Sequence, residues 1–429
     1  MSKPSSVVGS GFVLEPAART RLYPWIVGAA GLGPSLAMAF GGFRSQSLVK
    51  NTGDPYGYGK IAHGFLEHGF DKLTRRAASL YPHLLALIYW LGGSDRSVVL
   101  LQCVLQAGTC LLAFALGSRL YNARTGLFAG LLCAVHPMFL RYVADLHMES
   151  LLTFLCTLTV WCAVRFYQEQ TLRRGTALGA VGMITTLTKG VILPYVVLFG
   201  VLVAFLAIRS QPRNRRTLSA VAAMFATMAV LIAPWTYRNY EVTGGRFVLL
   251  TPGSSDSFLR GYVFTRSEFA TLSRPPYTDA ENLCNYWFRN IARDAGTVWE
   301  ADEVVDEQNN KRVARDLILH HPIDTIRKCV VGLFTFWYEM TTLKNSLVPL
   351  VLAVFGWALT WVGWQRARRE GRPTWLLVLP IVVMNVFVAV LIPLGRYSTP
   401  ILPCLMVLAA FGIDSILSRR EVTLSPGRP

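Results

Sequence analysis

Charged residues are scarce in this sequence, and acidic residues are the scarcest. Only 16% of the 429 residues are Asp, Glu, Lys or Arg, and 25 acidic residues stand against 42 basic ones. Apolar residues make up 52% of the chain, and they come in runs near the ~20 residues that a helix needs to cross a bilayer. A soluble protein of this length would hold two or three domains. The long runs instead predict an all-α polytopic membrane protein.

Several familiar signatures are also missing. The eight cysteines form no C-x-x-C pair, which excludes zinc-finger and thioredoxin interpretations. No Gly-rich phosphate loop lies between a strand and a helix, so we expect no nucleotide-sugar site. The N-terminus lacks a cleavable signal pattern, and Arg19 and Arg21 directly precede the first apolar run. This arrangement predicts a retained anchor with a cytoplasmic N-terminus.

The net charge of +17 raises the question of nucleic acid binding. The excess of Lys and Arg lies in short loops between apolar runs, where such residues set membrane topology. We therefore expect no nucleic acid partner.

Most of the cysteines fall in apolar runs, where they are expected as small buried side chains: Cys103, Cys110, Cys133, Cys156, Cys162 and Cys404. Cys284 and Cys329 lie in the longest polar segment. If that segment is outside the cytoplasm, the two could form a disulfide. Two unpaired thiols are the open alternative.

The hydropathy pattern predicts about ten spans: 22–43, 97–116, 125–142, 148–166, 175–187, 191–208, 218–235, 346–364, 374–394 and 398–417. The run 80–91 is too short to cross and predicts a re-entrant or interfacial helix. We divide the chain into a tail (1–22), a core (23–235) with a first-loop motif (51–96), an extracytoplasmic loop region (236–345), C-terminal spans (346–418) and a second tail (419–429).

The charge distribution predicts which face is cytoplasmic. With the N-terminus inside, the cytoplasmic regions are the two tails and the loops at Arg119, Arg173, Arg209 and Arg366, and all of them are basic. Both termini are then cytoplasmic, as the positive-inside rule requires. Asp54, Asp145, Glu149, Lys189, Arg238 and Arg396 all fall on the opposite face.

The polar segment after the seventh predicted span contains two expected helices. Residues 301–319 predict one helix, which His320, His321 and Pro322 end. Apolar residues then recur at helical spacing, with Arg327 and Lys328 on the other face: Ile323, Ile326, Val330, Leu333, Phe334 and Trp337. This pattern predicts an amphipathic helix at the membrane surface. A short buried helix is an equally open alternative.

Three carboxylates are candidates for chemistry. Asp54 lies between Gly53 and Pro55, where an N-cap or turn carboxylate is the alternative to a functional one. Asp145 and Glu149 are four residues apart, on one face if a helix extends to both. Capping of the helix that follows is their structural alternative. With His147 they could bind a cation, but no recognised metal spacing supports a divalent metal.

Three basic residues lie on the same predicted face. Lys189 sits between two apolar runs, where an ammonium group needs a counter-ion such as a lipid phosphate. Arg238 and Arg396 lie beside spans. Snorkelling to the head groups is the alternative for Lys189, and interfacial anchoring is the alternative for Arg238 and Arg396. Together with the acids, they suggest a site for a phosphate leaving group and a base.

The candidate residues lie in short motifs along the chain. These motifs are Gly53-Asp54-Pro55-Tyr56-Gly57-Tyr58, Tyr81-Pro82-His83-Leu84-Leu85, His147-Met148-Glu149-Ser150-Leu151, Thr188-Lys189-Gly190, Ala233-Pro234-Trp235-Thr236-Tyr237-Arg238-Asn239, and Arg396-Tyr397 with Pro400 and Pro403. In their order and spacing, the motifs resemble those of the GT-C superfamily of membrane glycosyltransferases. The resemblance is to the bacterial branch of this superfamily that is similar to protein O-mannosyltransferases and the lipid A aminoarabinose transferase, and it covers most of the chain. It implies a GT-C-like helix bundle with juxtamembrane helices.

The resemblance also implies an activity, an inverting hexosyl or pentosyl transfer from a polyprenyl-phosphate sugar to an extracytoplasmic lipid, glycan or protein. It places the protein in the inner (plasma) membrane, with membrane lipid around it and no certain cofactor. Asp54 would be the base, Glu149 would orient the acceptor or the Asp54 loop, and Asp145 or Glu149 would supply a second charge. The candidate substrate-binding residues are Tyr56, Tyr58, Lys60, Tyr81, His83, Lys189, Arg238, Arg396 and Tyr397.

One departure from the family pattern matters. The second acid of the first-loop pair is Pro55 in this chain, so the mechanism either uses Asp54 alone or finds its second carboxylate elsewhere. A transporter or flippase of lipid-linked saccharides is the rival class. Transporters often have two related halves, and no internal repeat is visible here. A non-catalytic assembly protein is the third alternative, in which the clustered charges would be idle.

Overall fold

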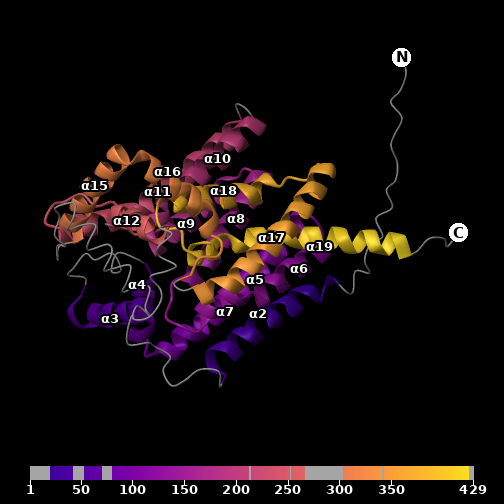
Figure 1. Ribbon diagram of the computed structural model, residues 1–429, viewed down its shortest axis with the longest axis horizontal. Helices are drawn as coiled ribbons and strands as arrows, with labels where there is room; N and C mark the ends of the chain where they lie inside the picture. The colour runs from indigo at the N-terminus through magenta and orange to yellow at the C-terminus, as the bar shows by residue number, and fades with distance from the viewer. Residues whose placement is uncertain are drawn as a thin grey trace, which may run out of the picture.

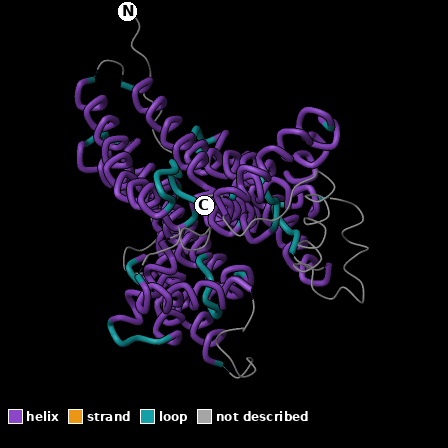
Figure 2. Tube along the Cα trace, turned by 90° about the vertical axis from the view of Figure 1, so that its left-hand side faces the viewer, coloured by secondary structure: helices purple, strands orange, loops and turns teal. Residues whose placement is uncertain are grey.

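The computed structural model describes residues 20–41, 53–69, 80–211, 214–251, 253–265, 303–340 and 343–424, and these contain helices and no strands (Figures 1 and 2). The α-helices are α2 (Tyr23–Phe40), α3 (Gly53–His68), α4 (Leu80–Trp90), α5 (Asp95–Leu120), α6 (Ala123–Val135), α7 (Pro137–Val143), α8 (Glu149–Gln168), α9 (Leu172–Thr188), α10 (Leu193–Ser210), α11 (Arg215–Val242), α12 (Ser254–Phe264), α15 (Glu303–His320), α16 (Pro322–Thr335), α17 (Leu343–Arg369), α18 (Trp375–Val390) and α19 (Leu402–Leu424). Three short 3-10 helices are η1 (Gly190–Ile192), η2 (Gly395–Tyr397) and η3 (Thr399–Ile401).

The helices confirm a multi-pass membrane protein. Among the described residues, six helical segments are long and apolar enough to cross a bilayer, and α6 with α7 makes a seventh if the bent pair is one span. Each of the ten predicted spans overlaps a helix or this pair, but α2, α9 and α18 do not meet the same test of length and apolar content. The count of ten therefore remains a prediction, as does the division into regions.

The third predicted span, 125–142, is not one straight helix. The chain bends by 53° between α6 and α7, and the two together make one span if the bent pair crosses the membrane as a unit. His136, at the break, has an extended backbone because the proline ring of Pro137 disfavours the helical conformation in the preceding residue. His136 then caps α7, since its Nδ1 accepts the backbone N–H of Met138 at 3.3 Å.

Polar caps start several long helices at one end of the bundle. Asn122, Thr171 and Asn214 precede α6, α9 and α11, and each side-chain oxygen accepts a backbone N–H of the first turn. Such a cap satisfies a donor that the helix itself leaves unpaired. The basic loops predicted from the sequence lie beside these caps.

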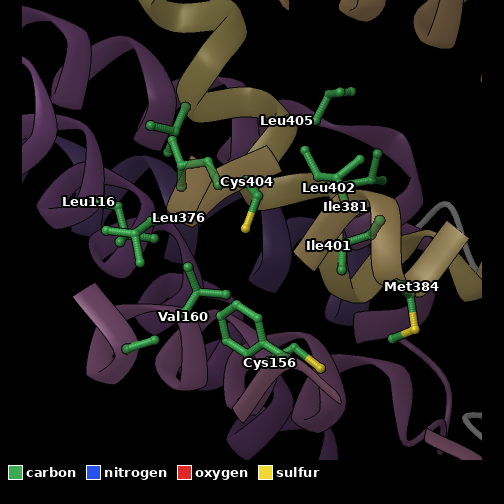
Figure 3. Packing of buried hydrophobic residues seen from close by; sticks show 14 of the residues in the cluster. Leu116, Cys156, Val160, Leu376, Ile381, Met384, Ile401, Leu402, Cys404 and Leu405 are labelled. Atoms are coloured by element: carbon green, nitrogen blue, oxygen red, sulfur yellow. The ribbon is translucent and has the colours of Figure 1, made fainter. Parts of the chain in front are cut away.

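The core lies where α19 passes through the bundle. Its buried residues come from most of the long helices, among them α5, α8, α10, α18 and α19, and Figure 3 shows Cys156 and Val160 of α8 on one side with Ile401, Leu402 and Cys404 on the other. Close packing of this kind is the main force between helices in lipid, because the lipid tails are as apolar as the side chains. The cysteine prediction holds for five of the six core thiols, while Cys162 is only partly buried. Cys284 lies outside the described residues, so its pairing with Cys329 stays a prediction.

Helices too short or too polar to cross gather at one end of the molecule. Figure 1 shows α3, α4, α12, α15 and α16 at the left of the bundle, while the C-terminal end of α19 lies at the right. The short run at 80–91 forms α4 as expected. Residues 236–345 contain the expected helices α15 and α16, although α11 extends past the predicted border at residue 235.

Helix α16 has the predicted amphipathic character. Ile323, Ile326, Val330 and Phe334 all expose their side chains along it, so the alternative of a fully buried helix is wrong. Lys328, expected on the polar face, is instead only 2% exposed. Its ammonium group donates to the carbonyls of the last residues of α18, where a cation offsets the partial negative charge of a helix C-terminus.

Candidate functional site

A buried ion pair joins α8 and α9 at the end of the bundle that carries the short helices. Glu149 is the first residue of α8 and is 3% exposed, and Lys189 immediately follows α9. Lys189 Nζ lies 3.9 Å from Glu149 Oε1, and His147 Nδ1 lies 3.5 Å from Glu149 Oε2. The helix N-terminus adds a favourable field for the carboxylate. Glu149 therefore holds Lys189 in place, a pairing that sequence spacing did not predict.

The same ammonium group contacts the segment before α19. Lys189 Nζ lies 4.0 Å from the ring centroid of Tyr397, and Arg396 Cζ lies 5.2 Å from that ring. Arg396 is also close enough to act electrostatically on Glu149. Two cations thus share one aromatic ring, a favourable cation–π arrangement. The structure brings together Glu149, Lys189, Arg396 and Tyr397, which are far apart in sequence.

Gln102 fixes the loop that carries Asp145. Its side-chain amide donates to the carbonyls of Val143 and Asp145, each at 2.8 Å, and its oxygen accepts the hydroxyl of Tyr81 at 2.7 Å. Sequence reasoning missed Gln102. The available signal was a polar side chain inside an apolar run, because such a residue is costly unless it is hydrogen-bonded.

The first-loop motif packs against this loop through α3. Tyr58 lies edge-on to Tyr81 with centroids 5.3 Å apart, and a Cβ at Gly59 would come within 3.8 Å of Leu146. Residues 53–68 are helical from Gly53, so the turn expected as an alternative at Gly53-Asp54-Pro55 is not formed. Lys60 is exposed on the same helix.

Asp54 lies in the first turn of α3, just over one turn before Gly59. The side chains of Asp54 and Tyr56 lie outside the described part of the chain. The backbone alone places Asp54 on the helix that packs against the Asp145 loop.

His83 connects three elements. Its ring lies 4.7 Å from that of Phe65 on α3 and 4.9 Å from that of Trp235 on α11. The aromatic residues of α3 and α4 therefore continue to the end of α11, where Arg238 follows.

Asn239 anchors the chain next to Lys189. This fully buried amide donates to the carbonyls of Val248 and Leu250 at 3.0 and 2.8 Å, and its oxygen accepts a hydrogen bond from Arg238 at 3.2 Å. The segment so held reaches Gly190, where a Cβ would come within 2.5 Å of Thr251 Cγ2. Asn239 thus holds this segment against the turn after Lys189, and Arg238 hydrogen-bonds to Asn239 near the end of α11.

Sequence reasoning also missed Glu339. It lies between α16 and α17, and its carbonyl accepts the backbone N–H of Gly395 at 2.5 Å, directly before Arg396. Burial raises the pKa of Glu339 to about 8. No periodicity marks this residue, because its burial depends on the return of residues 391–398 from another part of the chain.

No metal centre is evident in the residues that the structure describes. They contain no group of three or more His, Cys, Asp or Glu side chains arranged to hold an ion. The side chain of Asp54 is not among those residues.

Comparison with known proteins gives a family match and several similar structures. Residues 77–237 match the family model described as dolichyl-phosphate-mannose-protein mannosyltransferase. No curated protein matches the sequence. The model is similar to the oligosaccharyltransferase AglB from Archaeoglobus fulgidus in complex with an inhibitory peptide and a dolichol-phosphate, with a TM-score of 0.56 and 14% identity over 95% of this chain.

Two further structures of the Archaeoglobus fulgidus oligosaccharyltransferase are similar. The apo form gives a TM-score of 0.57 at 13% identity over 96% of this chain, and the complex with Zn and sulfate gives 0.54 at 16% identity over 92%. The chain spans about half the length of these relatives, covering 52%, 52% and 50% of them. The chain therefore has a GT-C type membrane fold, and residues 77–237 carry the sequence pattern of the mannosyltransferase family.

Proposed function

We propose that this protein is an inverting glycosyltransferase that moves a sugar from a polyprenyl-phosphate donor to an extracytoplasmic hydroxyl of a lipid, glycan or protein. The family match and the GT-C type fold support a lipid-linked donor. The observation that carries the proposal is the cluster in which Lys189 and Arg396 share the ring of Tyr397 beside Glu149. A phosphate within reach of two cations would be stabilised as it leaves.

In the proposed reaction, the acceptor oxygen attacks the anomeric carbon and forms the new glycosidic bond. The bond from that carbon to the phosphate oxygen breaks, and the polyprenyl phosphate leaves with its electron pair toward Lys189 and Arg396. The hydroxyl proton passes to a carboxylate that acts as general base. Attack opposite the leaving group inverts the configuration.

Asp54 remains the proposed base because Glu149 already has a cationic partner. Glu149 would lose that pairing on accepting a proton, at a cost that a buried ion pair makes large. Asp54 lies on the helix that packs against the Asp145 loop. Pro55 occupies the second acidic position, so other carboxylates must supply the supporting roles. We assign to Asp145 the orientation of the first-loop motif that carries Asp54, and to Glu149 the orientation of Lys189.

The test uses purified protein in liposomes with radiolabelled polyprenyl-phosphate hexoses and pentoses. Extracted membrane lipid, cell-wall glycan and membrane protein serve as acceptors. We expect transfer to fall by about 100- to 10,000-fold in Asp54→Asn, as for loss of a general base. Glu67→Gln, an exposed acid on the same helix, is the matched control and should keep full transfer.

Unchanged transfer in Asp54→Asn would remove the base assignment. Absence of transfer with every donor, combined with movement of labelled lipid-linked saccharide between leaflets, would favour the transporter instead.

We also propose that both termini are cytoplasmic in an inner (plasma) membrane and that the site faces outward. The placement of the basic loops at the end opposite Glu149 supports this orientation. A reporter that is active only in the cytoplasm, fused after residue 429, should be active. A second reporter is inserted in the 266–300 segment and should be inactive. If the C-terminal fusion is inactive and this second fusion is active, the proposed orientation is reversed.

A further inference from the structure

Two arginines flank one tryptophan at the end of the bundle opposite the candidate site. Arg119 in the last turn of α5 has its Cζ 6.0 Å from the ring centroid of Trp161, and Arg165 of α8 has its Cζ 5.7 Å from the same centroid. Arg119 Nε also donates to the side-chain oxygen of Gln168. Among the described residues, neither arginine forms an ion pair with a carboxylate.

Two more arginines, Arg174 and Arg216, lie near this pair to make a cluster, and both form ion pairs with one carboxylate, that of Glu169. Arg174 donates to the carbonyl of Arg165 at 2.9 Å and pairs with Glu169 at 2.5 Å, and Arg216 reaches the same carboxylate at 3.5 Å. Arg119 is subject to repulsion from both Arg165 and Arg174. Like charges repel one another, and an anion bound between them offsets that repulsion.

The cluster lies at the level of lipid head groups. Arg165 follows Glu149 by sixteen residues on the same helix, which separates the two by about 24 Å along the axis. That distance approaches the ~30 Å thickness of the hydrocarbon core, so the cluster lies near the other membrane surface. A tryptophan is typical of this interfacial depth.

We propose that Arg119, Arg165 and Trp161 form a binding site for the phosphate of an anionic phospholipid head group, with Arg174 at its edge. A guanidinium group can bind a phosphate through two parallel N–H···O hydrogen bonds. Its plane can stack on an indole ring at the same time. Basic pockets between membrane-spanning helices bind anionic head groups on the cytoplasmic side. The acyl chains of such a lipid would lie along the apolar surface of α5 and α8. This site does not depend on the proposed glycosyl transfer.

Attraction of lipid by net positive charge alone is the competing explanation, and it predicts a different result. Arg173 and Arg209 are exposed at the same end of the bundle, on α9 and α10, and contact no aromatic ring among the described residues. If only net charge attracts lipid, replacing these two should matter as much as replacing Arg119 and Arg165. If the geometry around Trp161 matters, the two double variants should differ.

The experiment measures lipid binding to the full chain in neutral detergent by native mass spectrometry, with phosphatidylglycerol, phosphatidylcholine and inorganic phosphate as probes. We expect phosphatidylglycerol to be retained, phosphatidylcholine to bind at least 10-fold more weakly, and millimolar inorganic phosphate not to displace the lipid. The variant Arg119→Gln/Arg165→Gln should weaken phosphatidylglycerol binding at least 10-fold, and Arg173→Gln/Arg209→Gln less than 2-fold.

Equal losses in the two double variants, equal retention of the two lipids, or displacement of lipid by inorganic phosphate would each overturn the proposal. If Arg119→Gln/Arg165→Gln does not fold, Arg119→Lys/Arg165→Lys keeps the charge but not the paired geometry. It should still weaken phosphatidylglycerol binding several-fold, and an unchanged affinity would show that charge alone is responsible.

Discussion

Glu149 and Lys189 face one another across the interface of α8 and α9, with their charged atoms 3.9 Å apart and both side chains largely buried. Each lies at the end of its helix, Glu149 where α8 begins and Lys189 where α9 has just ended. The pair thus places an ammonium group at a membrane end where a lone one would be costly. The contact of Lys189 with Tyr397 extends this arrangement to the segment before α19.

The ion pair should show strong energetic coupling. Lys189→Met leaves the buried Glu149 carboxylate without one of its cations, so we expect a loss of about 3 kcal/mol in the free energy of unfolding. Glu149→Gln/Lys189→Met should cost less than the two single changes together, with a coupling of about 1–3 kcal/mol. Unfolding in detergent, followed by tryptophan fluorescence, measures all four proteins. Additive single effects would show that the two residues act independently.

Replacing Gln102 should lower the transfer rate, whereas replacing Gln106, one turn away on the same helix, should not. Gln102→Leu leaves the carbonyls of Val143 and Asp145 and the hydroxyl of Tyr81 without their buried partner, which costs about 1–3 kcal/mol per group. Gln106→Leu is the control, since that buried amide donates to the carbonyl of Cys133 in the core. Both variants should lose stability, but only Gln102→Leu should lower the transfer rate of the folded fraction. Similar rates for the two would remove the proposed role of Gln102 in holding the Asp145 loop.

We expect that Gly395 cannot be replaced by alanine without loss of stability. A Cβ there would lie 3.0 Å from the carbonyl oxygen of Glu339 and 3.3 Å from Met340 Sδ. Gly395→Ala should therefore displace Arg396, lowering stability by about 1–3 kcal/mol and weakening donor binding. Gly33→Ala in α2, where nothing lies within 4 Å of the added Cβ, should be neutral or slightly stabilising. The thermal midpoint and the KM for donor distinguish the two, and an unchanged KM in Gly395→Ala would contradict the prediction.

Glu339 should make stability depend on pH. Its pKa is raised to about 8 by burial, above the ordinary value of 4.5. Between these two values the unfolded carboxylate releases a proton that the folded one retains, so stability falls as pH rises, by up to about 1.4 kcal/mol per pH unit. Glu339→Gln cannot ionise and should lack this decline. Thermal midpoints between about pH 5 and pH 8 compare the two proteins, and parallel pH profiles would exclude Glu339 as the source.

Much of the membrane architecture followed from local pattern. The apolar runs predicted helices at every span, the basic residues marked one end of the bundle, and the short run at 80–91 predicted a helix unable to cross. Hydropathy succeeds here because each backbone group in lipid must be hydrogen-bonded within its own segment. The break at His136 was missed, although the proline after it was a visible signal. The division between the predicted spans 175–187 and 191–208 is formed, since α9 ends at Thr188 and η1 begins at Gly190.

The candidate site followed only in part from the sequence. Pattern and resemblance selected Glu149, Lys189, Arg396 and Tyr397, and the structure places them together. They did not select Gln102 or Glu339, whose importance comes from partners that other segments bring to them.

By itself, the sequence determined that this chain is a bundle of membrane helices and which of its ends is basic, because both properties depend on residues adjacent along the chain. The tertiary structure alone decided that Lys189 pairs with Glu149, that Gln102 holds the Asp145 loop, and that Arg119 and Arg165 share one tryptophan. Contacts such as these join different helices, and their geometry depends on how the helices pack.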